Sequence, residues 1–98
     1  MKDEEPKRLL FTRKNSSVVE LIILPDIFGQ KHVGYIHKVF TDTEFRRRGY
    51  ASELTKEAIN RAKKEGCYKV FLLCDEKMVS FYEKIGMSRH QVGMEVRF

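Results

Sequence analysis

The sequence has only two cysteines, no apolar run of membrane-spanning length and no apolar stretch near its start. A transmembrane helix needs roughly 20 apolar residues, so we expect no integral membrane protein. Residues 1–6 are mostly charged and lack the apolar segment of a signal peptide, which favours a cytoplasmic location. With 98 residues, the chain has room for one domain, over 1–98.

The two cysteines are Cys67 and Cys74. Their spacing matches no metal-ligand pattern, and two cysteines make no disulfide framework, so we predict neither a metal site nor a disulfide. If both lie in one strand, an offset of seven residues places them on opposite faces of the sheet. We therefore expect two reduced, buried thiols.

The composition is that of a folded domain, with 42% hydrophobic and 34% charged residues. Lysine and arginine exceed aspartate and glutamate by 19 to 14, a net charge of +5. A basic chain favours an anionic partner. Nucleic acid, a phosphorylated metabolite and a nucleotide cofactor all remain open at this point.

Hydrophobic patterning predicts seven elements separated by turn residues. In chain order they are strands over 9–13, 18–24 and 34–40, a helix over 50–65, a strand over 67–74, a helix over 76–85 and a strand over 91–98. The first two strands form a hairpin, and residues 25–32 form a loop. A strand–helix–strand order predicts that 34–40 and 67–74 pair in parallel. The expected fold class is α/β, with a mixed central sheet.

The two helices have recognisable ends. Apolar residues recur every three or four positions in the first helix, at Ala51, Leu54, Ala58, Ile59 and Ala62. Gly66 is a C-terminal stop signal, and Asp75 is a candidate N-cap for the second helix. The run over 67–74 is almost continuously apolar, which predicts a central strand buried on both faces.

The segment 46–51 combines three arginines with a glycine immediately before the first helix. A helix N-terminus presents unpaired N–H groups and a positive dipole end. Gly49 allows a ligand close to the backbone. The pattern predicts a phosphate site, with a solvated basic loop or a nucleic-acid contact as alternatives.

Two motifs resemble the GNAT superfamily of N-acetyltransferases. Arg46, Gly49 and Ala51 fit its acetyl-CoA signature, Q/R-x-x-G-x-G/A, between a strand and a helix. Residues 81–87, FYEKIGM, resemble the end of its next signature and follow at the right separation. The resemblance covers roughly residues 9–98 and implies a GNAT-like acyltransferase fold with a strand–helix–strand acetyl-CoA-binding core.

Within the superfamily, the sequence most resembles the glucosamine-phosphate N-acetyltransferases. The residues typical of them are Cys67-Tyr68-Lys69, Leu72, Cys74, Val79, Phe81-Tyr82, Met94, Arg97 and Phe98. Compared with that family, the chain is short, because the first strand and two following helices have no counterpart. The resemblance implies a homodimer whose partner subunit helps to wall the acceptor site.

The resemblance also implies roles for individual residues. Backbone groups of Val39, Phe40 and Thr41 would hold the pantetheine arm, and the N–H near Val39 would polarise the thioester carbonyl. The loop before the helix would bind the pyrophosphate through Arg46, Arg47, Arg48, Gly49, Tyr50 and Ala51. Tyr82 would protonate the departing CoA thiolate while the amine attacks directly. The alternative is that Tyr82 only packs in the hydrophobic core beneath its helix.

Two positions depart from the sugar-phosphate family. His37-Lys38 replaces an acidic pair, so His37 is either a general base or a structural strand residue. Met78 replaces an asparagine and cannot donate that residue's hydrogen bond. Lys38 and Arg97 are the candidate substrate-binding residues, Arg97 through an acceptor phosphate.

The sequence therefore predicts an N-acetyltransferase that uses acetyl-CoA and a primary amine, by resemblance glucosamine 6-phosphate. Alternatives are another small amine or a protein amine as acceptor, and a CoA-binding module without catalysis. Nucleic-acid binding has support only in the charge and the three adjacent arginines, since no known nucleic-acid motif is present.

Overall fold

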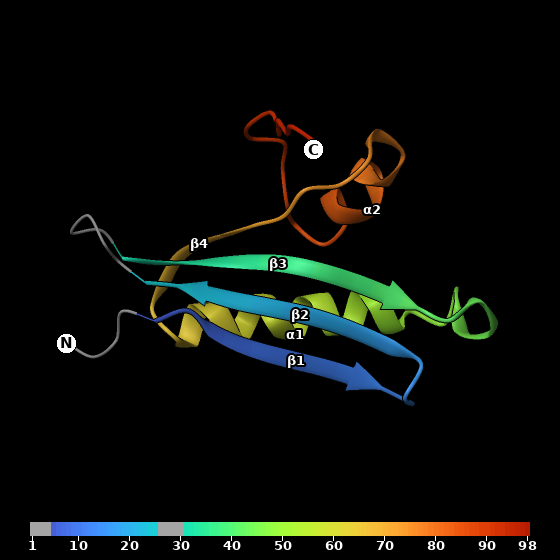
Figure 1. Cartoon of the computed structure of the whole chain (residues 1–98). Coiled ribbons are helices and arrows are strands. Elements are labelled where there is room, and N and C mark those ends of the chain that lie inside the picture. The colour runs from blue at the N-terminus through green and yellow to red at the C-terminus, as the bar shows by residue number, and fades with distance from the viewer. Residues whose placement is uncertain (1–4, 26–30) are drawn as a thin grey trace.

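The computed structural model describes residues 5–25 and 31–98, which form a four-stranded sheet with one long helix (Figure 1). The strands are β1 (Lys7–Arg13), β2 (Ser17–Leu24), β3 (His32–Thr41) and β4 (Cys67–Phe71), and helix α1 (Tyr50–Lys64) joins β3 to β4. The strand order is β1-β2-β3-β4, with antiparallel pairing up to β3 and a parallel β3–β4 pair. This confirms the predicted mixed α/β sheet. Most of the loop predicted over 25–32 lies outside the described residues.

Helix α1 covers one face of the sheet, and the core lies between them (Figure 1). Its apolar stripe buries Leu54, Ala58 and Ala62 against the β2 residues Val19 and Leu21. Burying a leucine completely stabilises a fold by about 2 kcal/mol, so this stripe explains why α1 docks where it does.

Helix α1 begins and ends at glycines with left-handed backbone. Gly49 precedes the helix with φ of 80°, and Gly66 follows it with φ of 92°. The predicted stop at Gly66 is confirmed, since a left-handed residue after the last turn cannot continue a helix. Arg61, Lys63 and Lys64 lie in the last turn, where positive charge interacts favourably with the helix dipole.

Strand β4 differs from the prediction. It ends at Phe71, three residues earlier than expected, and lies at an edge of the described sheet rather than in its centre. Residues 72–74 leave the sheet because β3 no longer pairs with them beyond Tyr35. Cys67 is half-buried in β4 and Cys74 is exposed beyond it, so the prediction of two buried thiols in one strand is wrong.

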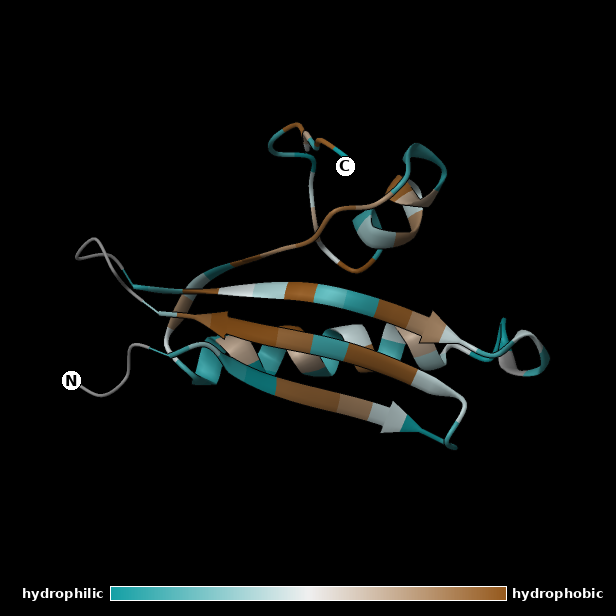
Figure 2. Ribbon diagram, in the orientation of Figure 1, coloured by the Kyte–Doolittle hydropathy of each residue, from teal (hydrophilic) through white to brown (hydrophobic). Residues whose placement is uncertain are grey.

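The C-terminal part is less regular than the pattern indicated. A 3-10 turn (Glu76–Met78) leads into the short helix α2 (Val79–Glu83), and Asp75 makes no side-chain cap hydrogen bond. The strand predicted over 91–98 is wrong: this segment has no regular structure, and Val92, Met94, Val96 and Phe98 are exposed. Alternating hydrophobicity does not make a strand where no neighbour pairs with it. Figure 2 shows the apolar colouring of this segment away from the core.

The sheet face opposite α1, here called the open face, has no helix over it among the described residues (Figure 1). Cross-strand partners share a face, so the register places Leu10, Glu20 and Lys38 side by side there. Phe40 and Val18 form the next pair along this face. Leu10 and Phe40 are well exposed. No described helix is both long enough and apolar enough to cross a membrane.

Candidate functional site

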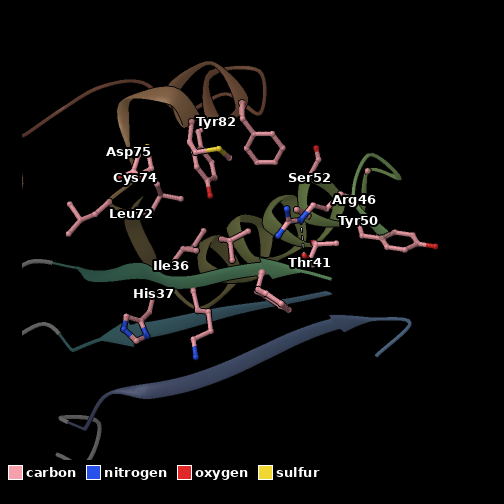
Figure 3. A pocket seen from close by; sticks show the side chains of 18 of the residues that line it. Ile36, His37, Thr41, Arg46, Tyr50, Ser52, Leu72, Cys74, Asp75 and Tyr82 are labelled. Atoms are coloured by element: carbon pink, nitrogen blue, oxygen red, sulfur yellow. Dashed lines mark hydrogen bonds between the residues drawn. The ribbon is translucent and has the colours of Figure 1, made fainter. Parts of the chain in front are cut away.

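A cavity of about 770 Å³ opens where β3 and β4 separate (Figure 3). The last parallel partners are Tyr35 and Phe71, and the cavity begins at the next β3 residue, Ile36. Three parts of the chain line it: β3 over 36–41, the loop and first turn of α1 over 46–52, and the segment 72–82. The lining residues are Ile36, His37, Lys38, Val39, Phe40, Thr41, Arg46, Arg47, Gly49, Tyr50, Ala51, Ser52, Leu72, Leu73, Cys74, Asp75, Met78, Phe81 and Tyr82.

One edge of β3 faces this cavity without a strand partner. β2 pairs with the other edge as far as Thr41, whereas β4 pairs only as far as Tyr35. Residues of a strand direct their backbone N–H and C=O groups alternately to its two edges. The stretch 36–41 therefore offers backbone donors and acceptors to whatever occupies the cavity. Val39, Phe40 and Thr41, predicted from the resemblance to lie beside a ligand, are among these lining residues.

The N-terminus of α1 closes one end of the cavity. Two left-handed residues, Arg47 at φ 71° and Gly49 at φ 80°, turn the loop into the helix. The residue before the helix is Gly49, so the first turn of α1 has no N-cap side chain, and the first N–H groups of a helix lack carbonyl partners within the helix. The Nε of Arg46 donates a hydrogen bond to the carbonyl oxygen of Thr41 at 3.2 Å, which ties the basic loop to the end of β3. This combination of a helix N-terminus and basic side chains is the kind of arrangement that binds anions.

Tyr82 lies on the opposite wall, in α2. The residue is only 8% exposed, and the Phe81 ring packs edge-on against it with centroids 4.9 Å apart. Its hydroxyl points toward β3 in Figure 3. Burial, and to a smaller extent the charge of a deprotonated Cys74, raises the pKa of Tyr82. The phenol therefore keeps its proton at neutral pH and is a hydrogen-bond donor.

The wall between Tyr82 and β4 is largely apolar. Leu72, Leu73, Cys74 and Met78 line it, and the loss of β4 pairing brings the first three of these to the cavity. The sequence pattern placed Leu72, Leu73 and Cys74 in a strand, so their position in the cavity wall was not predicted. Met78 occupies the expected position, where its thioether supplies no donor.

His37 and Lys38 line the cavity, but the His37 side chain lies on the other side of β3 from Tyr82 (Figure 3). The β2–β3 register skips His37, since Glu20 pairs with Lys38 and Leu21 pairs with Ile36. This irregularity is a β-bulge, a feature that redirects side chains and is frequent beside active sites. It places His37 on the open face, where its Nδ1 lies 2.9 Å from Glu20 Oε1.

Glu20 and Arg8 were not predicted to take part in any site. Glu20 is 4% exposed, and its second carboxylate oxygen forms an ion pair with Arg8. The hydrogen bonds from His37 and Arg8 hold the pKa of Glu20 below its ordinary range. One signal was available in the sequence, because Glu20 is the single charged residue inside the apolar strand 17–24.

Two predicted site residues lie outside the cavity. Arg48 does not line it. Arg97 is exposed in the irregular C-terminal segment, where its Nε pairs with Glu95 Oε2 at 3.0 Å. Among residues 5–25 and 31–98 no group of three or more histidine, cysteine, aspartate or glutamate side chains has the arrangement of a metal site.

Comparison with known proteins gives consistent matches. The sequence model described as "Acetyltransferase (GNAT) family" matches residues 1–87. A glucosamine 6-phosphate N-acetyltransferase of Trypanosoma brucei brucei is 35% identical over 68 residues, covering 69% of this chain and 46% of the relative. A glucosamine 6-phosphate N-acetyltransferase of Oryza sativa subsp. japonica is 32% identical over 67% of this chain and 40% of its own length. The chain thus spans about half the length of these relatives.

Two solved structures superpose closely on this chain. A crystal structure of a Trypanosoma brucei acetyltransferase superposes with a TM-score of 0.84 at 28% identity, covering 97% of this chain and 70% of that one. The glucosamine-6-phosphate N-acetyltransferase of Arabidopsis thaliana gives a TM-score of 0.83 at 24% identity, with 98% and 69% coverage, and shares the fold. The chain belongs to the acetyltransferase (GNAT) family.

Proposed function

We propose that this chain is an N-acetyltransferase that moves an acetyl group from acetyl-CoA to a primary amine. The observation that carries this proposal is a single cavity with three different walls. One wall is the unpaired edge of β3, one is the N-terminus of α1 with Arg46 and Arg47, and one holds the buried phenol of Tyr82.

Each wall suits a different part of acetyl-CoA. The pyrophosphate matches the N–H groups and positive dipole end of α1, together with Arg46 and Arg47. The pantetheine arm contains amide groups, which can hydrogen bond to the free edge of β3 over 39–41. A backbone N–H near Val39 would polarise the thioester carbonyl. Arg48, outside the cavity lining, stays a prediction from the resemblance.

Tyr82 is the proposed general acid. When the amine nitrogen bonds to the thioester carbon, the carbon–sulfur bond breaks and leaves a thiolate. The Tyr82 hydroxyl is protonated at neutral pH and reaches into the cavity, so it can supply the proton that the sulfur needs. The direct attack forms no covalent intermediate on the enzyme.

For the acceptor we propose glucosamine 6-phosphate. Its support is the name of the Trypanosoma and Oryza relatives and the cationic Lys38 in the cavity lining, which suits a phosphate group. Arg97 stays a candidate for the same phosphate.

A different small or protein amine is the second candidate, favoured because His37 and Lys38 give this part of the site no acidic pair for an ammonium group. A CoA-binding module without catalysis is a third, favoured by Met78 in the cavity.

We also propose a homodimer, which would cover apolar side chains of the open face such as Leu10 and Phe40. Light scattering during size exclusion checks this directly, because the mass of one chain is 11.6 kDa. A cytoplasmic location stays a prediction from the sequence.

The function is tested by incubating the protein with acetyl-CoA and glucosamine 6-phosphate and detecting the acetylated sugar by mass spectrometry. Product detection is preferable to a thiol reagent, because the exposed Cys74 would react with that reagent. We expect Tyr82→Phe to lower kcat by about 100-fold, the scale of a general acid, with unchanged acetyl-CoA binding. The matched control is Tyr68→Phe, since Tyr68 is exposed on β4 outside the cavity. Binding of acetyl-CoA without transfer to any amine would favour the non-catalytic module.

A further inference from the structure

A buried carboxylate lies on the open face, beside the cavity but on the other side of β3. Glu20 is in the middle of β2, and its side chain is almost fully buried. Both of its oxygens have partners: Oε1 contacts His37 Nδ1 at 2.9 Å, and Oε2 forms the ion pair with Arg8. The hydrogen bonds from His37 and Arg8 both favour the anionic carboxylate and lower the pKa of Glu20.

This contact fixes the proton arrangement of the His37 ring. An ionised carboxylate only accepts hydrogen bonds, so Nδ1 must be the protonated nitrogen. In the neutral ring, Nε2 then holds the lone pair. The His37 side chain is 50% exposed, and no other hydrogen bond of this ring is found in the described part of the chain. Tyr35 supports the ring with centroids 5.6 Å apart.

The position of His37 suits contact with a substrate. It is the bulge residue of β3 and the second lining residue after the last β3–β4 pair. His37 therefore lies level with the start of the cavity, at the far end of the lining stretch from Thr41 and Arg46, with its ring on the open face. Tyr82 faces the cavity side of β3 and His37 faces the open face, so the two residues can serve different atoms of one reaction.

We infer that His37 is the base that deprotonates the acceptor ammonium through Nε2, and that Glu20 is the positioning residue that fixes its tautomer. This inference rests on the proposed acetyltransferase function. Such pairing of a carboxylate with Nδ1 leaves the distal nitrogen ready to take a proton.

The proton balance of the reaction closes with these groups. Nε2 takes one proton from the ammonium, and the free amine attacks the thioester carbon. The carbon–nitrogen bond forms, the carbon–sulfur bond breaks, and the thiolate takes the Tyr82 proton. The phenolate recovers a proton from the new amide nitrogen, and the imidazolium releases its proton to solvent.

Two cationic side chains besides His37 neighbour Glu20. Arg8 faces it from β1, and Lys38 is its cross-strand partner on β3. The neighbouring β2 residues Val19 and Leu21 point to the other face, against α1.

The test compares Glu20→Gln, His37→Gln and the wild type in steady-state kinetics from pH 5.5 to 9. We expect His37→Gln to lower kcat about 100-fold, the lower end of general-base effects. We expect Glu20→Gln to lower kcat about tenfold, with an unchanged KM for acetyl-CoA, because the His37 ring loses the contact that orients it. The matched control is Glu65→Gln, because Glu65 is also ion-paired, with Lys7 and Arg61, but lies outside the cavity lining. A folded Glu20→Gln protein with the wild-type kcat overturns the inference.

A second measurement does not depend on activity. Nitrogen-15 NMR of the wild-type protein reports which ring nitrogen of His37 carries the proton in the neutral state. We expect protonated Nδ1; a ring protonated at Nε2 overturns the inference alone, with transfer activity intact. Absence of transfer to any amine by the wild type contradicts the proposed function, and the base role with it.

Discussion

Arg46 and Thr41 are joined by a hydrogen bond from the guanidinium Nε to the backbone carbonyl oxygen, at 3.2 Å. The bond connects the loop before α1 to the last residue of β3, across the mouth of the cavity. One side chain thereby sets the position of the proposed anion site relative to the proposed binding edge.

Replacing this side chain should weaken binding of the nucleotide part of the substrate. We expect Arg46→Gln to raise the Kd for CoA about tenfold, because a hydrogen bond to a charged group contributes about 1.5–3 kcal/mol. Isothermal titration calorimetry measures this directly. Arg89→Gln is the control, since Arg89 pairs with Glu76 outside the cavity lining. An equal loss in both variants would mean that only net charge matters.

The close packing of β3 on α1 gives a prediction about stability. A Cβ on Gly34 would lie 3.2 Å from Ala62 Cβ and from Val70 Cγ2, tighter than ordinary contact. We expect Gly34→Ala to cost about 1–3 kcal/mol through overpacking, measured by urea unfolding. When Gly34→Ala is made in the Ala62→Gly variant, it should cost less free energy of unfolding, because the methyl group of Ala62 is absent. Equal costs in the two backgrounds would show that Ala62 is not the obstacle.

Acid should weaken the fold through Glu20. The hydrogen bonds from His37 and Arg8 lower its pKa in the folded state, so folding favours the ionised carboxylate. The stabilisation is complete above the ordinary glutamate pKa of about 4.5 and is lost as pH falls through the lower folded value. Urea unfolding of wild type and Glu20→Gln should therefore differ at pH 7, and the difference should shrink as the pH falls below about 4.5. A difference that stays constant as the pH falls would contradict the prediction.

The two thiols should differ in reactivity. Cys74 is exposed and lines the cavity, whereas burial raises the pKa of Cys67 and leaves less of the reactive thiolate. We expect a fast and a slow phase with a thiol-reactive disulfide, and the fast phase should vanish in Cys74→Ser. Acetyl-CoA should slow the fast phase. Modification of Cys67 first would contradict this assignment.

Sequence reasoning located the parts of the structure that local patterns determine. The apolar stripe of α1, its stop at Gly66 and the strand over 34–40 all depend on neighbouring residues, and all were predicted within two residues. The end of β4 was not predictable in this way. Leu72 and Leu73 are as apolar as the strand before them, and they leave it only because β3 no longer pairs there.

The remaining features that the sequence did not predict depend on how residues far apart in the chain pair with one another. Glu20 and His37 are 17 residues apart, and their contact depends on a bulge that the pattern of residues 34–40 does not reveal. The strand predicted over 91–98 is wrong, because alternating hydrophobicity does not supply the neighbouring strand with which it would pair. The resemblance to a known family contributed Tyr82 and the segment 39–41, because no periodicity singles them out.

The separation of β3 from β4 leaves the sheet with a gap that a ligand could fill as an additional strand would. A bound pantetheine arm would then extend the hydrogen-bonded ladder beyond Tyr35. Ligand binding would therefore raise the free energy of unfolding. Backbone amides on the free edge over 36–41 should exchange with solvent quickly in the empty protein and slowly when it is loaded. The ligand would thus stabilise strand β3, which itself forms one wall of the cavity.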